Sequence, residues 1–341
     1  MRVGVIARTN SRGLDVQTTE AARNLNASVL IVDVRNHSNQ QFPSDITRFP
    51  GAPVVECMPG WKLDPAIVKP WLDTVDVVYS AETFYDPQFT RWARAKHVVT
   101  VVHANPEFVA PGGGWAIGDP SARWSPTCWR NEFMPQPTDV VVFPVAMDRF
   151  APVEPHDGQC RWLHVGGKQA MADRNGTESL LEALRHLKEP CTVAVCTQES
   201  AVGRFTVPSH VTVNVVKSVP NYWDLYPGHD ALVMPRRYGG LCLPTQEAMA
   251  AGMAVLMPGI SPNPQTWPVA TFPARLDQEA RMPAGQVPVA SIDPVALAAA
   301  MDRFADPKER HDYQARSQVW AASHSWNMLR PDWLQRMSSL R

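Results

Sequence analysis

Residues 230–261 bring together a carboxylate, two arginines and a glycine-containing loop in a strand–loop–helix–strand order. An apolar run predicts a buried strand, and a polar loop with Arg236 and Arg237 follows it. A helix then begins near Pro244, with Glu247 in its first turn, and a second apolar run predicts the next strand. The Glu247 carboxylate could accept from a sugar hydroxyl, while the helix start and the arginines could hold an anion. Since ligands of parallel sheets lie at the carboxyl ends of strands, this pattern predicts a binding site.

The same stretch resembles the donor-site signature of the retaining GT-B glycosyltransferases of family 4. The proline of that signature falls on Pro235, and its Glu-Ala-Met-Ala segment begins at Glu247. The resemblance implies that Glu247, the second acid of the signature, contacts the nucleotide ribose. The first acid, which contacts the donor sugar, falls on Gly239, and this departure leaves the sugar open. The donor contacts that the resemblance implies in this loop are Gly239, Gly240, Leu241 and Leu243. The alternative is an ordinary βαβ unit with an alanine-rich packing helix.

A second segment resembles the part of the family that holds the diphosphate. Relatives carry an arginine and a lysine there, whereas this chain has Gly167, after Gly166, and Asn175. Lys168 and Arg174 stand next to these positions, so the charge could be relocated onto them. The chemistry needs such cations, because a leaving nucleoside diphosphate develops negative charge that fixed cations stabilise. For Lys168 and for Arg174, the alternative is an ordinary solvated side chain in a loop.

A bend after an expected strand supplies the candidate nucleobase contacts. The family offers backbone groups to the base at this bend, which here comprises Lys217, Ser218 and Val219. Tyr222 and Trp223 follow after two further residues, and packing is the alternative role for both.

The first half of the chain holds the candidates for the acceptor side. His103 ends an apolar run, and the resemblance implies a histidine near the transferred sugar at a matching place. A lone histidine is more often structural, so both roles stay open. Gly13 and Leu14 lie at the first strand–helix turn, where glycine lets backbone approach a ligand. Trp115 follows three glycines in the irregular stretch 104–137, and its flat ring suits a sugar or a base.

Length and periodicity predict an α/β protein of two domains. A chain of 341 residues exceeds one ordinary domain. The resemblance implies the GT-B fold, with two Rossmann-like domains facing a central cleft and a C-terminal helix crossing back to the first domain. The expected boundaries are 1–150 for an acceptor-side domain, 151–315 for a donor domain and 316–341 for the returning helix. The expected strands are 3–7, 29–34, 75–80, 98–103, 140–145, 192–196, 211–216, 231–234 and 254–257.

Composition limits the possible partners. The net charge of −1 gives no general attraction to nucleic acid or anionic lipid. No apolar run is long enough to span a membrane, and the apolar start of the chain is too short for a signal peptide. The six cysteines show no metal-binding spacing, so free thiols in a reducing cytoplasm are expected.

The resemblance implies an enzyme that moves a hexosyl group from a UDP- or GDP-sugar to a hydroxyl acceptor with retention of configuration. It implies no metal and no cofactor beyond the nucleotide-sugar co-substrate. The acceptor stays open among a small molecule, a glycan, a protein and a modified base of phage DNA. Two other functions also stay open: a nucleotide-sugar epimerase of the same architecture, and a nucleotide-sugar binding protein with a degenerate site. The second is motivated by Gly239 and Asn175.

Overall fold

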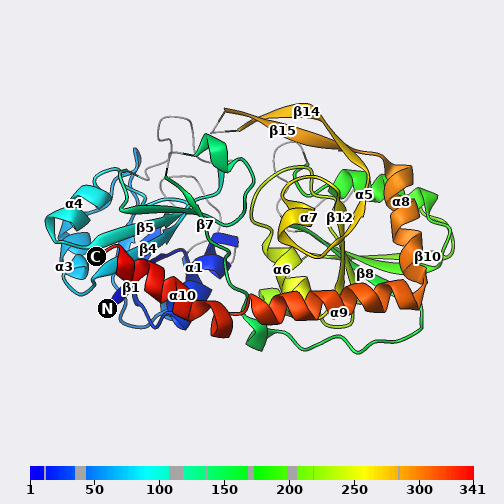
Figure 1. Ribbon diagram of the computed structural model, residues 1–341, viewed down its shortest axis with the longest axis horizontal. Coiled ribbons are helices and arrows are strands. Elements are labelled where there is room, and N and C mark those ends of the chain that lie inside the picture. Colours follow the sequence, from blue (N-terminus) through cyan, green and yellow to red (C-terminus); the bar gives the residue numbers. More distant parts are fainter. Residues whose placement is uncertain are drawn as a thin grey trace. The chain divides into compact units, whose positions relative to one another are not determined.

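The computed structural model describes residues 1–10, 13–34, 44–106, 118–134, 137–167, 173–197, 206–217, 219–282 and 285–341. The chain forms two compact units. Unit 1 holds Met1–Pro144 together with Trp326–Arg341, and unit 2 holds most of the chain between them. Each unit is built on its own parallel sheet with helices packed against it (Figure 1). The α/β fold class predicted from the sequence is confirmed.

Unit 1 contains a seven-stranded sheet in the order β3-β2-β1-β4-β5-β6-β7, and every neighbouring pair is parallel. The strands are β1 (Val3–Ala7), β2 (Ser28–Asp33), β3 (Val54–Glu56), β4 (Val77–Ala81), β5 (Val99–His103), β6 (Ala122–Ser125) and β7 (Asp139–Val140). The helices are α1 (Gly13–Asn24), α3 (Pro65–Leu72), α4 (Phe89–Ala95) and α10 (Trp326–Ser339), with 3₁₀ turns at Ile46–Arg48 and Asn131–Phe133.

Side-chain alternation along the strands separates the two faces of this sheet. Ile6 and Val78 share a core with Trp71 of α3 and Phe89 of α4. Tyr79, one residue on, points to the opposite face, where its hydroxyl lies 3.2 Å from the Gln17 amide of α1. A helix therefore covers each face of the sheet, and the strands are buried on both sides.

Two sequence expectations for unit 1 need correction. The stretch 104–137 was expected to be irregular, but it contains β6, which pairs with β5 from Val101↔Ala122 to His103↔Trp124. The expected strand 140–145 is only Asp139–Val140. Beyond it, the Val142 carbonyl accepts a hydrogen bond from the Trp333 indole at 3.2 Å. The indole N–H thus takes the place of a backbone N–H from a neighbouring strand.

Unit 2 contains a six-stranded parallel sheet in the order β10-β9-β8-β11-β12-β13. Its strands are β8 (Cys160–Gly167), β9 (Cys191–Thr197), β10 (Val211–Val216), β11 (Ala231–Val233), β12 (Ala254–Pro258) and β13 (Ala270–Phe272). β14 (Ala274–Met282) and β15 (Gly285–Ile292) form a separate two-stranded sheet. The helices are α5 (Thr177–Ala183), α6 (Leu243–Ala250), α7 (Asn263–Thr266), α8 (Pro294–Asp302) and α9 (Pro307–Ser323), with 3₁₀ turns at Met147–Arg149, Leu184–His186, Tyr222–Leu225 and Arg303–Ala305.

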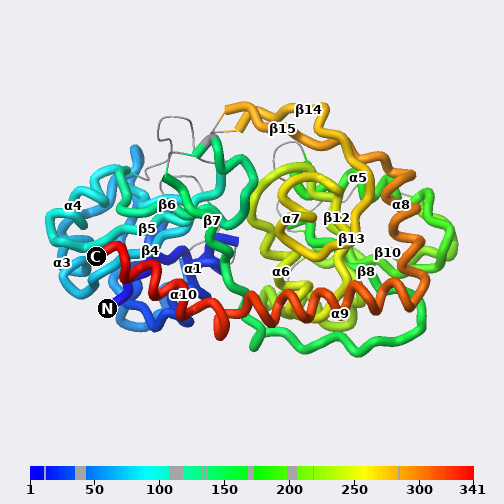
Figure 2. Tube along the Cα trace, viewed as in Figure 1, coloured from blue at the N-terminus to red at the C-terminus, as the bar shows by residue number. Residues whose placement is uncertain are grey.

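The C-terminal tail belongs to two helices, where the sequence predicted one returning helix over 316–341. α9 ends at Ser323 and belongs to unit 2, while α10 begins at Trp326 and belongs to unit 1 (Figure 2). Trp333 anchors α10, because its ring is almost fully buried and packs against Tyr79 and Trp124 at centroid distances of 5.4 and 5.1 Å. The last helix therefore completes the core of unit 1, to which the first strands of the chain belong.

Both sheets are doubly wound. The strand order reverses between β1 and β4 in unit 1 and between β8 and β11 in unit 2. Loops leaving neighbouring strands diverge at such a reversal and open a crevice that ligands of α/β proteins use. Each unit therefore has one edge at which a site is expected. Among the residues that the structure describes, none of the helices is long and apolar enough to cross a membrane.

Candidate functional site

The predicted donor residues gather where the strand order of unit 2 reverses. β8 and β11 are neighbours, paired at Ala231↔Trp162 and Leu232↔Leu163, so their carboxyl ends lie at one edge. β8 ends at Gly166 and Gly167, and the chain leaving β11 runs through Arg236 and Gly239 to α6. The structure thus brings together two sequence segments that lie about 70 positions apart.

Arg236 holds the loop between β11 and α6 in shape. Its side chain is buried, with only 4% of its surface exposed. Its Nε donates to the Tyr238 carbonyl at 2.9 Å and its Nη1 donates to the Leu241 carbonyl at 2.6 Å. The sequence predicted an anion-binding arginine here. These bonds show a guanidinium that stabilises the loop by donating to two of its backbone carbonyls.

Gly239 lies between two guanidinium groups. Its φ of +115° is a conformation that favours glycine. A Cβ at this position would lie within 3 Å of Nη2 of both Arg236 and Arg174. The guanidinium of Arg174 also lies over the Tyr238 ring, 5.7 Å from its centroid. Two cations therefore converge beside the start of α6, in the space where a side chain at position 239 would lie.

Arg237 connects this loop to the two-stranded sheet. Its Nε donates to the Ala290 carbonyl at 2.7 Å, and its Nη2 donates to the Gln278 side chain. Its backbone N–H donates to the Arg174 carbonyl at 2.8 Å. Arg237 thereby positions the backbone of Arg174, a role that the sequence did not indicate.

The start of α5 is held by the side chains of Asp173 and Asn175. The Asp173 carboxylate accepts from the backbone N–H groups of Thr177 at 2.9 Å and Glu178 at 3.1 Å. Asn175 donates through Nδ2 to the Gly166 carbonyl at 2.9 Å. The Asp173 bonds occupy two backbone N–H groups of the first turn of α5, so a ligand anion at this edge would depend largely on side-chain cations such as Arg174.

His164 is a buried connector between β8, β11 and α5. Its Nδ1 lies 3.0 Å from the Val233 carbonyl and its Nε2 lies 2.8 Å from Thr177 Oγ1. Because a carbonyl only accepts, Nδ1 carries the proton and Nε2 accepts from the Thr177 hydroxyl. Burial lowers the pKa of His164 to about 4, so the ring is neutral at physiological pH.

This histidine gives a testable pH dependence. The folded-state pKa lies below the ordinary value of 6.5, so the unfolded chain binds a proton that the folded chain excludes. The free energy of unfolding should therefore fall as pH drops from about 6.5 to about 4, by up to roughly 1.4 kcal/mol per unit of pH. Chemical denaturation of His164→Asn should show a weaker pH dependence than wild type. The exposed His186, changed to Asn, is the control, and an unchanged dependence in His164→Asn would contradict this account.

Glu247 is the principal carboxylate of the edge. It lies in α6, is 7% exposed, and accepts a hydrogen bond from the Tyr226 hydroxyl. Tyr226 is almost fully buried, with the Phe150 ring edge-on at 5.3 Å. Burial, with the adjacent Glu247, raises the pKa of Tyr226 well above its usual value, so the phenol stays protonated and donates. Sequence reasoning missed Tyr226, because nothing in its local pattern links it to a residue 21 positions away.

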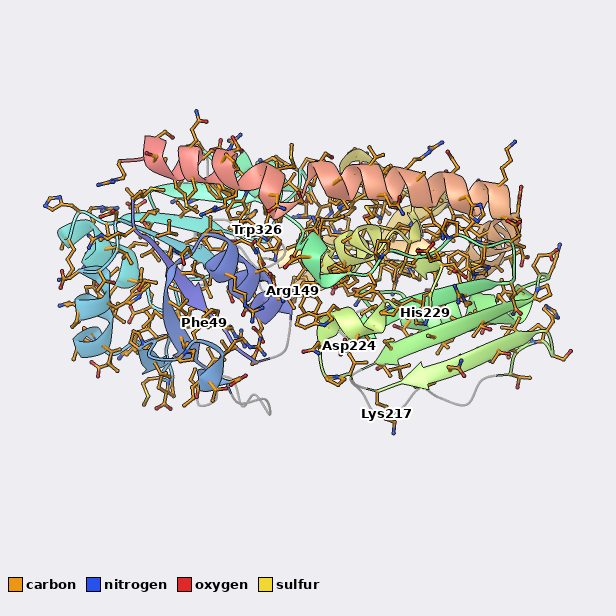
Figure 3. All side chains as sticks on the ribbon, turned by 90° about the horizontal axis from the view of Figure 1, so that it is seen from below. Phe49, Arg149, Lys217, Asp224, His229 and Trp326 are labelled. Atoms are coloured by element: carbon orange, nitrogen blue, oxygen red, sulfur yellow. The ribbon has the colours of Figure 1, made fainter. Side chains whose placement is uncertain are left out.

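The predicted nucleobase bend lies after β10. Lys217 is exposed and points away from the body of unit 2, and Val219 is half-buried (Figure 3). Ser218 lies outside the described residues. Trp223 lies under the Arg149 guanidinium, with 5.0 Å between guanidinium carbon and ring centroid. Tyr222 packs against Trp223 at 5.0 Å, which agrees with the packing alternative for this pair.

His103 belongs to the aromatic core of unit 1. It is 1% exposed, its Nδ1 lies 3.1 Å from the Tyr79 hydroxyl, and its ring lies 5.6 Å from that of Trp333. Burial lowers its pKa to about 3, so it stays neutral. This environment favours the structural role. Gly13 is exposed at the start of α1 and Leu14 is half-buried. The other two candidates, Lys168 and Trp115, lie outside the described residues.

Comparison with known proteins shows the fold. No family model matches this chain, and no curated protein matches it. The chain is similar to solved structures of glycosyltransferases. These include Anabaena HepE in complex with UDP and glucose (TM-score 0.67, 10% identity, 99% of this chain and 100% of the other). The lipopolysaccharide outer core galactosyltransferase WaaB has a TM-score of 0.61 and 13% identity over 98% of this chain and 100% of its own. Sucrose-phosphate synthase from Thermosynechococcus elongatus has a TM-score of 0.64 and 13% identity over 98% of both chains. The chain has the GT-B fold.

Proposed function

We propose that this protein is a glycosyltransferase that moves a hexosyl group from a UDP- or GDP-sugar to a hydroxyl acceptor with retention of configuration. The observation that carries the proposal is the convergence of the Arg174 and Arg236 guanidinium groups on Gly239, at the edge where β8 and β11 meet and just before α6, the helix that carries Glu247. The fold supports it, because solved structures of this fold include HepE in complex with UDP-glucose and with UDP.

Each part of the edge then has a role. Glu247 binds the ribose through its carboxylate, whose orientation Tyr226 fixes. Arg174 neutralises the diphosphate, together with Lys168, and the Gly240–Leu243 stretch offers its backbone at the start of α6, where anions are favoured. Arg236 and Arg237 hold the loop and the Arg174 backbone in place.

The proposed reaction forms one bond and breaks another at the anomeric carbon. The acceptor oxygen bonds to this carbon on the face from which the diphosphate leaves, and the leaving phosphate takes the acceptor proton. Its growing negative charge is what Arg174 stabilises. No enzymic nucleophile, metal ion or further cofactor is part of the proposal. We place the enzyme in the cytoplasm, since all six cysteines are free thiols.

A panel of UDP- and GDP-sugars tests this function. The purified protein is incubated with each donor, with and without EDTA, and donor hydrolysis is followed by mass spectrometry. We expect slow hydrolysis of at least one donor that EDTA leaves unchanged, and an anomeric configuration that is retained in the product by NMR. Formation of an epimerised donor would instead identify an epimerase. Calorimetric binding of nucleoside diphosphate without turnover of any donor would identify a binding protein.

Tyr226→Phe should weaken the affinity for the nucleoside diphosphate about three- to tenfold. The phenylalanine keeps the packing against Phe150 but cannot donate to Glu247, and one such bond contributes roughly 0.5–1.5 kcal/mol. Calorimetry with UDP and GDP measures the change, and Tyr313→Phe, on α9, is the matched control. Wild-type affinity in a folded Tyr226→Phe would show that the hydroxyl does not position Glu247.

A further inference from the structure

The linker turn, residues 145–150, is the segment by which the chain enters unit 2 from unit 1. Its first residue, Val145, forms a parallel bridge with Ser325, the last residue of unit 2 before the chain returns to unit 1. The Val145 N–H donates to the His324 carbonyl at 3.0 Å. A 3₁₀ turn over Met147–Arg149 follows. The outgoing and returning segments of the chain are therefore joined within unit 2.

The end of the linker turn packs against the 3₁₀ turn Tyr222–Leu225, which is also part of unit 2. The guanidinium carbon of Arg149 lies 5.0 Å from the centroid of the Trp223 ring, a distance at which a cation is attracted to an aromatic face. The next residue, Phe150, has its ring centroid 6.0 Å from that of Tyr222. Two consecutive side chains of the linker turn thus contact the same aromatic turn.

The aromatic turn is held in shape by its own hydrogen bonds. The Asp224 carboxylate accepts from the backbone N–H of Asn221 at 3.1 Å and from the Asn221 amide at 3.0 Å. Asp224 and Arg149 are both labelled in Figure 3, on the two turns. Tyr226 follows the turn, and its N–H donates to the Trp223 carbonyl at 3.4 Å. A contact on this turn therefore also fixes the position of Tyr226.

Phe150 contacts Tyr226 directly as well. Phe150 is 8% exposed, and its ring meets the Tyr226 ring at a centroid distance of 5.3 Å and an angle of 83°. This edge-on arrangement is favoured between aromatic rings, and burial restricts both side chains to it. The Tyr226 hydroxyl in turn donates to the Glu247 carboxylate. One side chain therefore separates the linker turn from the carboxylate that is proposed to bind the ribose.

A second connection reaches the other end of α6. The Val153 N–H, three residues after the linker turn, donates to the Ala251 carbonyl at 2.8 Å. The Ala251 N–H donates to the Glu247 carbonyl at 3.0 Å, within the last turn of the helix. The segment that enters unit 2 is thus bonded to the end of α6 and packed against the tyrosine that orients Glu247.

We propose that the linker turn sets the affinity for the nucleoside diphosphate, with Phe150 as a positioning residue. Phe150 orients Tyr226, and Tyr226 orients the Glu247 carboxylate for the ribose. The coupling is reciprocal, because a ligand that favours one arrangement of Glu247 also favours the arrangement of the linker turn that supports it. The inference rests on the proposed function, which supplies the nucleotide. It extends the donor site to the segment that joins the two units.

A double-mutant cycle in nucleotide binding tests this inference. Phe150→Ala should weaken the affinity for UDP or GDP, measured by calorimetry, about three- to tenfold. In a Glu247→Ala background the same substitution should change the affinity less than twofold, because the carboxylate that Phe150 positions is then absent. Phe150→Leu keeps most of the apolar volume and should show a smaller loss. It replaces the alanine variant in the cycle if that variant fails to fold.

Phe304→Ala is the matched control, since Phe304 is fully buried in the core of unit 2 and packs against Trp162 at 5.2 Å. It should lower the stability of unit 2 and leave the nucleotide affinity of the folded protein within twofold of wild type. An equal loss of affinity from Phe150→Ala with and without Glu247 would overturn the inference, because Phe150 would then only support the fold. Wild-type affinity in folded Phe150→Ala would overturn it too.

Hydrogen exchange followed by mass spectrometry gives a second readout. Saturating UDP or GDP should slow exchange in a peptide spanning 145–153 of wild type about three- to tenfold, because the coupling is reciprocal. The same nucleotide should leave this peptide unchanged in Tyr226→Phe, and a peptide over α3 of unit 1 is the internal control. Unslowed exchange over 145–153 in a wild type that binds nucleotide would overturn the inference and leave the proposed function intact. A wild type that binds neither nucleoside diphosphate nor nucleotide sugar would overturn both.

Discussion

Glu247→Ala is expected to lower the affinity for UDP or GDP about 10- to 100-fold. A hydrogen bond between a carboxylate and a ribose hydroxyl contributes roughly 1.5–3 kcal/mol, because one partner is charged. The effect should exceed that of Tyr226→Phe, since the alanine removes the ribose contact itself and also leaves the buried Tyr226 hydroxyl without its acceptor. Isothermal calorimetry with each nucleotide measures the change directly.

Comparing Glu247→Ala with Tyr226→Phe separates the loss of the ribose contact from the loss of the hydrogen bond that orients the Glu247 carboxylate. Glu247→Gln keeps the shape and an acceptor oxygen but removes the charge, so we expect an intermediate loss. Glu279→Ala, an exposed glutamate of β14, is the control for a lost carboxylate elsewhere. Thermal unfolding confirms that each variant is folded. Nucleotide affinity equal to wild type in folded Glu247→Ala would remove this residue from the donor site.

Local sequence patterns predicted part of the scaffold of the donor edge, although β8 was not among the expected strands. β1 and β10 lie at the predicted bounds, and β11 and β12 each differ from theirs by one residue. α6 begins at Leu243, next to its predicted start near Pro244. These elements are short, buried and bounded by proline or glycine. Their hydrophobic pattern and the residues at their ends therefore define them. β6 escaped prediction because Ala122–Ser125 lies among prolines and glycines and contains an arginine and a serine, so it is not an apolar run. Its pairing with β5 is a tertiary interaction.

The chemistry of the edge was less predictable, because it depends on contacts between distant segments. The sequence showed that Gly239 replaces an acid, but only the fold shows that Arg174, 65 positions earlier, lies beside it. For His103 the sequence predicted the position in the fold but not the environment of the side chain. Its place at a strand end was predicted, but alternation puts its side chain on the face that Trp333 covers, and Trp333 is contributed by the last helix of the chain. No local pattern carries that information.

Arg174→Ala is expected to lower the rate of sugar transfer about 10- to 1,000-fold while changing the free energy of unfolding little. A cation that faces the leaving diphosphate gains interaction energy as negative charge develops, so its loss falls mainly on kcat. Arg174 is half-buried, and its guanidinium lies beside Gly239 at the start of α6, where that charge would develop. Arg174→Lys should recover part of the rate, since lysine keeps the charge but not the bidentate geometry.

Arg185→Ala is the matched control, because Arg185 is an exposed arginine paired with Glu182 just beyond α5. Single-turnover measurements with the active donor separate the chemical step from nucleotide release. Lys168→Ala and the double variant show whether the two cations share the charge: if they do, the double variant should be slower than either single one. Wild-type rates in Arg174→Ala, Lys168→Ala and the double variant would refute the relocation of the diphosphate contacts onto these neighbouring residues. The stabilising positive charge would then have to come from the loop cations Arg236 and Arg237, whose bonds to Leu241 and Ala290 direct them toward the protein itself.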